Sequence, residues 1–345
     1  MRAGKWVALA LVLGLVAAAC GDDDATTTTA ASTVGTEDNP IQVLYVPSVS
    51  AEEIIAGGEL LADALNEATG LFFEVSVPTS YAATVEAMCA SPDDTMGFIP
   101  AQAYVLANNL CGVSIDLKAS RFGYTEYWTQ FVVQRDSDIQ SFEDLAGRTW
   151  GYTDPGSTSG YLIPQGMFLD SGVEPGEATE TGGHPNAVRA VYNGEVDFGT
   201  SFFSPNIDAD GNTVWDGTPE DADVPDDLVD TCALDAEGEL ECSGLYPRDA
   251  RRNLREELPD IIQKVRILTL SDPIPNDGVA FGPTFSAALR AQIVDAIKAF
   301  AADDPDGFAT AFDAYSWTSV ADTEDSEFDS IRAILTAIGF DLEDL

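Results

Sequence analysis

Three consecutive hydroxyl-bearing residues, Ser157-Thr158-Ser159, are the strongest chemical signal in the sequence. They follow a strand-like run at 148–152 and an Asp-Pro-Gly turn, and they precede an apolar segment at 161–169 that can form a helix. The first amides of a helix lack internal partners, and the helix dipole favours negative charge there. The pattern therefore predicts an anion-binding turn. Serine and threonine are equally typical of an ordinary helix N-cap, which is the alternative.

His184 is the only histidine in the chain, and it directly precedes Pro185. Because proline is favoured at the first helical position, we expect His184 to cap a second helix start. Two helix starts, three hydroxyl groups and one imidazole together suit a tetrahedral oxyanion. A lone histidine is also common as a satisfied surface or core residue, so the assignment depends on the rest of the chain.

Motifs for enzymatic chemistry are missing from the sequence. Residues 156–160, Gly-Ser-Thr-Ser-Gly, do not have the Gly-x-Ser-x-Gly spacing about either serine. The sequence contains no Walker loop, no His-Glu-x-x-His and no Rossmann glycine pattern. We therefore expect a binding protein without a cofactor. A secreted hydrolase that pairs one serine with His184 is the alternative.

Strand-like and helix-like segments alternate along the chain, which predicts an α/β protein. Strand-like runs at 41–46, 72–77 and 96–100 are separated by helical segments, as in a parallel sheet with helices on its faces. A second alternating unit follows between 131 and 199. A strand at 266–270 and the segment 271–281 then indicate a return crossing. At 345 residues the chain exceeds one typical domain, so we expect two compact lobes.

The charge of the chain is unusual, because 59 acidic residues outnumber 16 basic residues and give a net charge of −43. A nucleic-acid partner is excluded, since phosphate-backbone binding requires a basic face. Such acidity indicates adaptation to salt or repulsion that keeps a surface protein in solution, with compositional bias of the genome as the alternative. The global field opposes an anionic ligand, so recognition must come from local donors sheltered from water.

The amino-terminal segment resembles a bacterial lipoprotein signal over residues 1–20. Basic residues at 1–5 precede an apolar stretch at 6–19 that is too short to span a membrane comfortably, and small residues precede Cys20. Lipid on Cys20 would anchor the protein to the outer face of the cytoplasmic membrane. Ala17 stands where an aliphatic residue is usual, so a plain cleaved signal and a periplasmic protein are the alternative. The polar residues 21–39 are expected to form a flexible tether.

Four cysteines remain once Cys20 is set aside. An exported protein meets an oxidising compartment, so we expect two disulfides. Sequence proximity favours pairing Cys89 with Cys111 and Cys232 with Cys242 over the two other connectivities. A zinc site is the alternative, although the spacings are wrong and only one histidine is present.

The second cysteine pair lies in an acidic insertion at 206–247, which is rich in glycine and proline and is expected to be a surface excursion. Asn206, Asp208, Asp210 and Gly211 have the spacing that opens a calcium-binding loop. Gly217 stands where the closing glutamate is required, so an acidic turn is the preferred interpretation and no metal site is expected.

Several segments together resemble the phosphate-, phosphite- and phosphonate-binding proteins of ABC transporters, the PhnD-like solute-binding proteins. The resemblance covers roughly residues 40–340 apart from the insertion. A turn at 141–147 is common to many solute-binding proteins, whereas the Ser-Thr-Ser-Gly-Tyr-Leu-Ile-Pro run at 157–164 is more specific. The other matching segments are Thr79-Ser80-Tyr81, Gly182-Gly183-His184 with residues 193–197, and residues 274–278.

This resemblance implies a type II periplasmic-binding fold, in which two α/β lobes joined by two crossing strands close on a ligand. Lobe 1 would comprise residues 40–128 and 272–345, and lobe 2 residues 129–271. The resemblance also assigns ligand contacts. Ser157, Thr158, Ser159 and His184 would hold the ligand oxygens, Tyr81 would close over them, and Tyr127 would be a second aromatic contact. Asp277 would accept a proton from a ligand oxygen or pair with a ligand amine.

The implied function is that of an extracytoplasmic solute-binding component that delivers an oxyanion to ABC permease subunits. Family members that take aminoalkyl phosphonates tend to carry an extra acid after the strand at 196–199. Residues 201–205, Ser-Phe-Phe-Ser-Pro, carry no charge here. We therefore expect phosphate, phosphite or a small uncharged phosphonate. Another small ligand, such as a thiamine precursor or a sulfonate, is the alternative within the binding class.

Overall fold

A computed structural model describes residues 33–340 of the chain. The predicted signal segment, Cys20 and most of the predicted tether lie outside the described residues. The tether was expected to reach residue 39, but ordered structure begins earlier. Val34 is buried in the core of the first lobe, and the Gly35 carbonyl accepts a hydrogen bond from the Phe72 amide at 3.0 Å.

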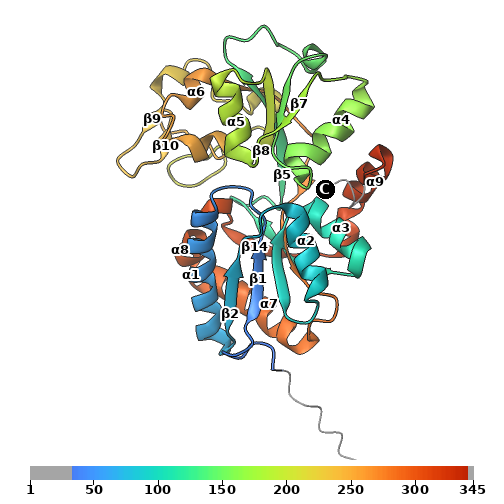
Figure 1. The fold of residues 1–345 in the computed structure, drawn as a ribbon. Coiled ribbons are helices and arrows are strands. Elements are labelled where there is room, and N and C mark those ends of the chain that lie inside the picture. The colour runs from blue at the N-terminus through green and yellow to red at the C-terminus, as the bar shows by residue number, and fades with distance from the viewer. Residues whose placement is uncertain (1–32, 341–345) are drawn as a thin grey trace, which may run out of the picture. The chain divides into compact units, whose positions relative to one another are not determined.

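Lobe 1 is built around a six-stranded sheet of order β14-β4-β13-β3-β1-β2 (Figure 1). The sheet is parallel at β1 (Ile41–Tyr45), β2 (Phe73–Ser76) and β3 (Thr95–Ile99), as the alternating pattern predicted. The remaining strands join it antiparallel: β4 (Ser114–Ser120), β13 (Gly278–Phe281) and β14 (Ser319–Asp322).

Helices cover both faces of this sheet. Successive side chains of a buried strand point to opposite sides, so the strands contribute to a core on each face. Val43 and Tyr45 of β1 belong to one core, with α1 (Ala51–Thr69), α7 (Ala287–Asp303) and α8 (Pro305–Ala311). Leu44 belongs to the core on the other face, with α2 (Tyr81–Ala90) and α3 (Ala101–Cys111). Ser50 and Ser80 cap α1 and α2 by accepting hydrogen bonds from backbone amides.

Lobe 2 is built around a second sheet of order β11-β5-β8-β6-β7. Its strands are β5 (Glu126–Gln134), β6 (Trp150–Tyr152), β7 (Ala178–Glu180), β8 (Phe198–Phe203) and β11 (Val265–Leu270). The β6, β7 and β8 strands are parallel, and β5 runs antiparallel to β8 and β11. The helices of this lobe are α4 (Ile163–Ser171), α5 (His184–Asn193) and the short α6 (Ile261–Lys264).

The chain crosses between the lobes twice, and the two crossings pair with each other. β5 leads into lobe 2, and β12 (Ile274–Pro275) pairs antiparallel with its first residues on the return. Asn276 fixes the junction, because its side-chain amide donates to the Ala119 and Tyr124 carbonyls at 3.0 Å each. The expected boundary at 128/129 falls within β5, and the one at 271/272 falls just before β12, so the division into these two lobes stays a prediction.

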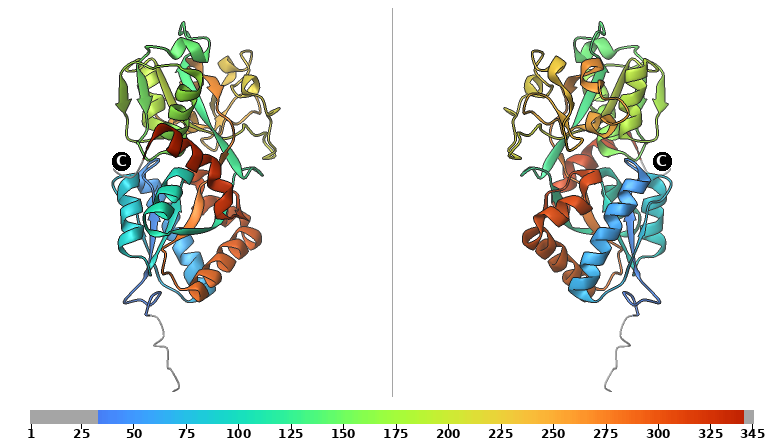
Figure 2. Two further views of the ribbon diagram at one scale, coloured as in Figure 1. Left: turned by 90° about the vertical axis from the view of Figure 1, so that its right-hand side faces the viewer. Right: turned by 90° about the vertical axis from the view of Figure 1, so that its left-hand side faces the viewer.

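The last helix, α9 (Asp329–Ile338), lies beside both lobes, as the side views show (Figure 2). It packs against α3 of lobe 1 and α4 of lobe 2. At the second contact, a Cβ atom added to Gly166 would lie 2.9 Å from Ile334 Cγ2, so glycine permits the close approach. Within residues 33–340, no helix combines the length and apolar character needed to cross a membrane.

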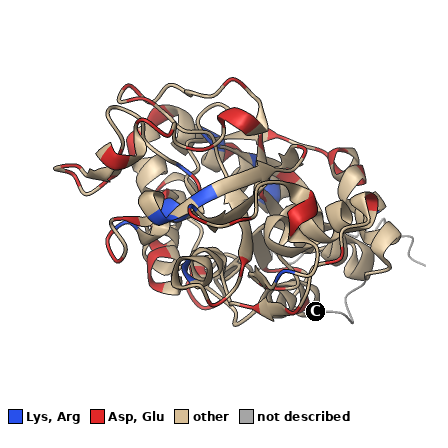
Figure 3. Ribbon diagram, turned by 90° about the horizontal axis from the view of Figure 1, so that it is seen from above, with Lys and Arg blue, Asp and Glu red and all other residues tan. Residues whose placement is uncertain are grey.

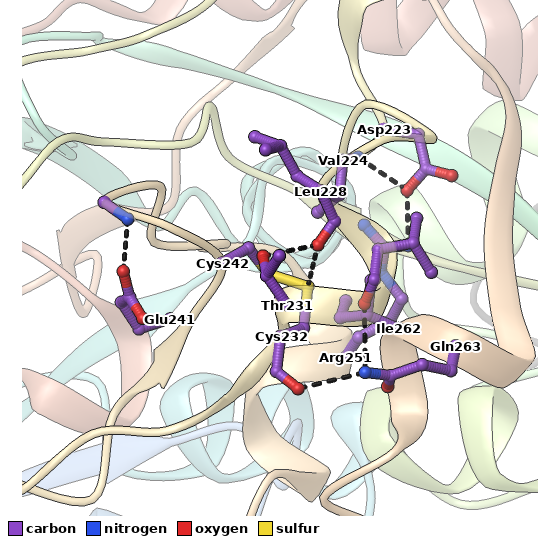
Figure 4. Close-up of a disulfide and its surroundings, with 12 residues drawn as sticks. Asp223, Val224, Leu228, Thr231, Cys232, Glu241, Cys242, Arg251, Ile262 and Gln263 are labelled. Carbon is purple, nitrogen blue, oxygen red and sulfur yellow. Dashed lines mark hydrogen bonds and ion pairs between the residues drawn. A yellow bond between two sulfur atoms is a disulfide. The ribbon is translucent and has the colours of Figure 1, made fainter.

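Both predicted disulfides are present. Cys89 and Cys111 join the ends of α2 and α3, and Cys232 and Cys242 close a loop within the insertion. In the close-up of the second disulfide, the Gln263 side chain donates to the Cys232 carbonyl at 3.0 Å (Figure 4). The insertion itself carries the short strands β9 (Ala233–Leu234) and β10 (Leu240–Glu241).

The expectation that the insertion is only a surface excursion is wrong. Several of its apolar side chains are buried in a core shared with the lobes, namely Ala222, Val224, Val229 and Leu240. Ile207 is also buried, at 5% exposure. Its candidate calcium loop closes as an acidic turn, since the Asp208 carboxylate accepts bonds from the Asp210 and Asn212 amides. In the part of the chain that the structure describes, no three acidic, histidine or cysteine side chains gather as a metal site.

Candidate ligand-binding site

A cavity of about 40 Å³ lies between the lobes, beside the two crossing strands. One water molecule needs about 10–15 Å³ on this measure, so the space fits a small ion rather than a large metabolite. The predicted ligand residues that line this cavity are Tyr81, Tyr127, Ser157, Ser159, His184 and Asp277. The structure therefore brings residues that are up to 196 positions apart in the sequence into one site.

The Ser-Thr-Ser segment forms a turn between β6 and α4. A single π-helical turn, Thr158–Leu162, precedes the α-helix, and Ser157 Oγ caps it by accepting a hydrogen bond from the Gly160 amide at 3.1 Å. The helix N-cap and one of the predicted ligand residues are thus the same residue, Ser157. The Thr129 hydroxyl holds the turn against β5 by donating to the Ser159 carbonyl at 2.9 Å. Gly160 is required, because a Cβ atom there would lie 1.9 Å from Thr153 Oγ1.

Thr158 differs from the prediction for the triple-hydroxyl run, because it does not line the cavity. Its Oγ1 accepts a hydrogen bond from the Gln102 amide at 2.9 Å, at the first turn of α3 in lobe 1. The hydroxyl therefore satisfies an otherwise unpaired helix amide across the lobe interface. The three hydroxyl groups, for which one shared role is predicted, thus have different surroundings, because Ser157 and Ser159 line the cavity and Thr158 does not.

His184 lines the cavity, but it does not cap its helix. Gly183 is the N-cap, with φ at 148°, and His184 is the first helical residue. The His184 ring packs edge-to-face against Phe202 with centroids 5.1 Å apart. Burial, reinforced by the nearby positive charge of Arg121, lowers the pKa of His184 to about 3. The imidazole is therefore neutral at physiological pH, and among the described residues its Nδ1 has no hydrogen-bond partner.

Two tyrosines from different elements add phenol groups to the polar lining. Tyr81 is the first residue of α2 in lobe 1, and Tyr127 lies on the crossing strand β5. Burial raises the pKa of both phenols well above the usual value, with the negative charges of Asp154 near Tyr81 and Asp277 near Tyr127 adding to the effect. Both groups thus stay protonated and remain hydrogen-bond donors.

Asp277 has a partner that the sequence analysis did not identify. Arg121, which directly follows β4, donates to the Asp277 carboxylate at 2.5 Å and also to the Asn276 side chain. The Arg121 guanidinium lies over the Tyr127 ring, 5.3 Å from its centroid. The cavity thus contains one buried cation besides its neutral donors, and Asp277 largely neutralises it. The expected pairing of Asp277 with a ligand amine loses its basis, because the carboxylate is already paired.

Several further residues that the sequence pattern does not predict also line the cavity. Lobe 1 contributes Ser48, Tyr315 and Trp317, and lobe 2 contributes Phe202. Ser48 follows β1, and the Trp317 ring is fixed by stacking on Phe312. Phe202 belongs to the uncharged segment 201–205. No local pattern identifies these residues, because long-range strand pairing brings them to the site.

The lobes make direct hydrogen bonds with each other around the cavity. The His184 amide donates to the Ser48 carbonyl at 3.1 Å, and the Gln102 side chain donates to the Pro155 carbonyl at 3.0 Å. Together with the bond between Gln102 and Thr158, these contacts close the cleft. The structure is therefore that of closed lobes.

Comparisons with known proteins agree with this architecture. Residues 43–328 match the family described as "ABC transporter, phosphonate, periplasmic substrate-binding protein". The phosphate-import protein PhnD of Mycolicibacterium smegmatis is 30% identical over 215 residues, which are 57% of this chain and 65% of that protein. The matched part thus spans just under two thirds of that relative.

Solved structures show the same fold at low sequence identity. A binding protein component of an ABC phosphonate transporter from Pseudomonas aeruginosa has a TM-score of 0.64 at 18% identity, covering 87% of each chain. PhnD1 from Prochlorococcus marinus, solved in complex with methylphosphonate, has a TM-score of 0.64 at 14% identity, covering 88% of this chain and 98% of that one. The fold is that of the type II periplasmic binding proteins. Because the family match spans most of its length, the chain belongs to the family of periplasmic substrate-binding proteins of phosphonate ABC transporters.

Proposed function

We propose that this protein binds phosphate, phosphite or a small uncharged phosphonate in the cavity between its lobes and delivers it to the permease subunits of an ABC importer. The observation that carries the proposal is the convergence of Ser157, Ser159 and His184 with Tyr81 and Tyr127 on one enclosed space. Hydroxyl groups and a neutral imidazole at two helix starts are donors suited to tetrahedral oxyanions. The names of the relatives, which refer to phosphate and methylphosphonate, support the same ligand class.

The size and charge of the cavity limit which small ligands can bind. A volume of about 40 Å³ holds a few water molecules, which disfavours a thiamine precursor. Phe202, near the end of β8, borders the space where an acid would be needed, and Asp277 is paired with Arg121. Among the described residues that line the cavity, no unpaired carboxylate is therefore placed to hold the amine of aminoethylphosphonate.

The buried cavity can bind an anion although it offers no unpaired cation among the described residues that line it. Hydrogen bonds to an anion are stronger where water is excluded, because the effective dielectric constant is lower. Neutral dipoles fixed in advance by helix starts need little reorganisation when the ligand enters. In a chain of net charge −43, this is the type of site that can hold an anion.

The hydrolase alternative has less support. A histidine acts as a general base when its pKa lies near the working pH, whereas the pKa of His184 is about 3. A Ser157→Ala variant separates the two functions. Binding is expected to weaken without any turnover, whereas loss of a measurable hydrolysis rate would support the enzyme.

Membrane attachment is a separate part of the proposal. The family places the protein outside the cytoplasm, and the sequence around Cys20 supports lipidation there. Replacement of Cys20 by serine should release the protein from membranes into the soluble fraction. Retention of the Cys20→Ser variant on membranes would argue against the lipid anchor.

A thermal-shift screen tests the ligand class directly. Purified protein freed of bound anions is compared with phosphate, phosphite, methylphosphonate, aminoethylphosphonate and sulfate, because a bound ligand raises the apparent stability by mass action. Phosphate, phosphite or methylphosphonate should give the largest rise in Tm. A larger rise with aminoethylphosphonate or sulfate would contradict the proposal.

A further inference from the structure

Two polar atoms on the lobe 1 side of the cavity have no hydrogen-bond partner among the described residues. They are Ser48 Oγ and Trp317 Nε1, and both are buried in residues that line the cavity. The same wall carries the apolar side chains Val46, Val49 and Phe98 and the polar side chains Tyr81, Arg121, Tyr315 and Asp277. Of the donor groups discussed above, Ser157, Ser159 and His184 come from lobe 2, and Tyr81 comes from lobe 1. Ser48 Oγ and Trp317 Nε1 therefore add two unpaired polar atoms to the lobe 1 side of the cavity.

The position of Trp317 is fixed by packing rather than by its N–H group. The indole stacks on Phe312 with centroids 4.7 Å apart and an interplanar angle of 2°, and it packs against Phe98 at 5.5 Å. The residue is only 1% exposed. A phenylalanine would supply similar apolar contacts without burying an unpaired donor, and an unpaired buried donor is costly. The indole N–H therefore calls for an acceptor that the described protein residues do not supply.

Ser48 is held in place by contacts across the lobe interface. Its carbonyl accepts the His184 amide at 3.1 Å, so lobe closure brings the serine next to the oxyanion donors of lobe 2. The neighbouring Tyr315 hydroxyl donates to the Val46 carbonyl at 2.9 Å. The Ser48 hydroxyl is thus positioned on the cavity wall and can both donate and accept a hydrogen bond.

We infer that Trp317 Nε1 and Ser48 Oγ bind the fourth oxygen of a tetrahedral ligand, so that the site selects phosphate over methylphosphonate and phosphite. This inference rests on the proposed function. In this arrangement three ligand oxygens would accept hydrogen bonds from the donors of lobe 2, the crossing strand and Tyr81, and the fourth substituent would face Trp317 and Ser48. Phosphate presents an oxygen there, methylphosphonate a methyl group and phosphite a hydrogen atom. A site built to hydrogen-bond an oxygen discriminates strongly against an analogue that lacks it, because the buried donors then stay unpaired.

Calorimetry with matched ligands and variants tests the inference. Phosphate and methylphosphonate are nearly isosteric, so the ratio of their dissociation constants reports the contacts to the fourth substituent. The wild-type protein should bind phosphate at least about tenfold more tightly. Trp317→Phe and Ser48→Ala should each weaken phosphate binding several-fold, leave methylphosphonate binding unchanged or tighter, and thus bring the ratio towards one.

Tyr45→Phe is the matched control. Tyr45 Oη is also buried without a partner among the described residues, and the ring stacks on Phe98 at 4.7 Å, but Tyr45 does not line the cavity. Its removal should leave the ratio unchanged. Thermal melts of each variant check folding, and Ser48→Ala keeps the test decisive if Trp317→Phe is unstable.

The outcomes separate this inference from the proposed function. Equal affinity of the wild type for the two ligands, or an equal loss of both in Trp317→Phe and Ser48→Ala, would overturn the inference while leaving the proposed function intact. Absence of binding for every phosphorus oxyanion would overturn the proposed function and the inference with it.

Discussion

The single histidine shows how burial determines chemistry at the scale of one residue. His184 lies in a closed cavity near Arg121, and both surroundings disfavour a second positive charge. The imidazole therefore contributes a donor or an acceptor but no net charge. Recognition of the anion then depends on directed hydrogen bonds rather than on opposite charge.

This neutrality predicts a pH dependence of stability. The pKa of His184 is about 3 in the folded state and about 6.5 in the unfolded state, so between these values only the unfolded chain binds the proton. Stability should therefore fall as the pH falls through this window, by about 2 kcal/mol between pH 7 and pH 5 from this residue alone.

Urea unfolding of the wild type and a His184→Asn variant at the two pH values measures this contribution. The variant lacks the titrating group, so its stability should fall by less over the same interval, while the carboxylates titrate in both proteins. Parallel losses in the two proteins would show that His184 is not held neutral.

Residues of the site differ in how far the sequence could predict them. Ser157, Ser159 and His184 stand at helix starts, which leave local signatures of hydroxyl groups, glycine and proline. Trp317 and Arg121 have no such signature. They reach the cavity because β4 pairs with β13 and β14, whose residues are far away in the sequence.

At the scale of elements, direct contacts between helix starts hold the lobes together. The Gln102 amide at the start of α3 donates to Thr158 Oγ1 at the start of the α4 segment. Because one element comes from each lobe, this bond exists only when the lobes are closed. Ligand affinity therefore includes the free energy of closure as well as contacts with the ligand.

A Thr158→Val variant tests this coupling. Valine keeps the shape but removes the acceptor, which leaves the buried Gln102 amide unpaired in the closed state at a cost of about 1–3 kcal/mol. Affinity should fall by roughly tenfold, mainly through faster dissociation, although the side chain does not line the cavity. Thr310→Val, which removes an exposed hydroxyl of α8, is the control. An unchanged dissociation rate in Thr158→Val would contradict the role of this bond.

The disulfide between Cys89 and Cys111 makes a separate prediction for the α2–α3 pair. It closes a loop of 22 residues, for which loop-closure entropy gives a stabilisation of about 3 kcal/mol. The double variant Cys89→Ala/Cys111→Ala should lose about this free energy of unfolding in denaturant titrations. Phosphate affinity should change little, because neither cysteine lines the cavity. A loss below about 0.5 kcal/mol would show that the crosslink is not stabilising.

Elements with a clear local period were predictable, and the alternation from β1 to α3 was found from the sequence. β4 was not among the predicted elements, although its apolar residues alternate from Ile115 to Ala119. Its polar members, Asp116 and Lys118, are satisfied by Arg290 and Glu327 from the end of the chain. The prediction that the insertion is a surface excursion was also wrong. Its acidic composition indicated an exposed segment, although several of its apolar residues are buried.

At the scale of the whole molecule, the charge opposes the proposed ligand. Acidic residues are distributed over many elements, whereas basic residues are few (Figure 3). A net charge of −43 creates a negative potential that repels an approaching anion. The affinity for the proposed anion must therefore come from contacts inside the cavity. The negative potential of the protein should slow the association of the anion.

This opposition predicts an unusual salt dependence. Added salt screens the repulsion over a Debye length of about 10 Å at 0.1 M, so the association rate of phosphate should rise several-fold from low to moderate ionic strength. Stopped-flow tryptophan fluorescence measures the rate, and a monoanionic ligand should show a shallower increase than a dianion. A rate that falls with added salt, as at a cationic site, would contradict the account.

The composition alone was sufficient to exclude a nucleic-acid partner. It also showed that an anionic ligand would have to bind against the negative charge of the protein. It could not reveal that Arg121 and Asp277 pair beside the cavity, because that contact joins residues 156 positions apart. The pair contributes little net charge to the cavity. The proposed anion must therefore still be bound mainly by neutral donors, as the acidic composition indicates.

The most direct test of the central claim is calorimetric titration of phosphate into purified protein freed of bound anions, for the wild type and the Ser159→Ala variant. Because Ser159 lines the cavity and a hydrogen bond to an ion contributes about 1.5–3 kcal/mol, we predict saturable one-to-one binding that the variant weakens by more than tenfold. Equal affinity in both proteins, or no binding of phosphate, phosphite or methylphosphonate to the wild type, would contradict the claim.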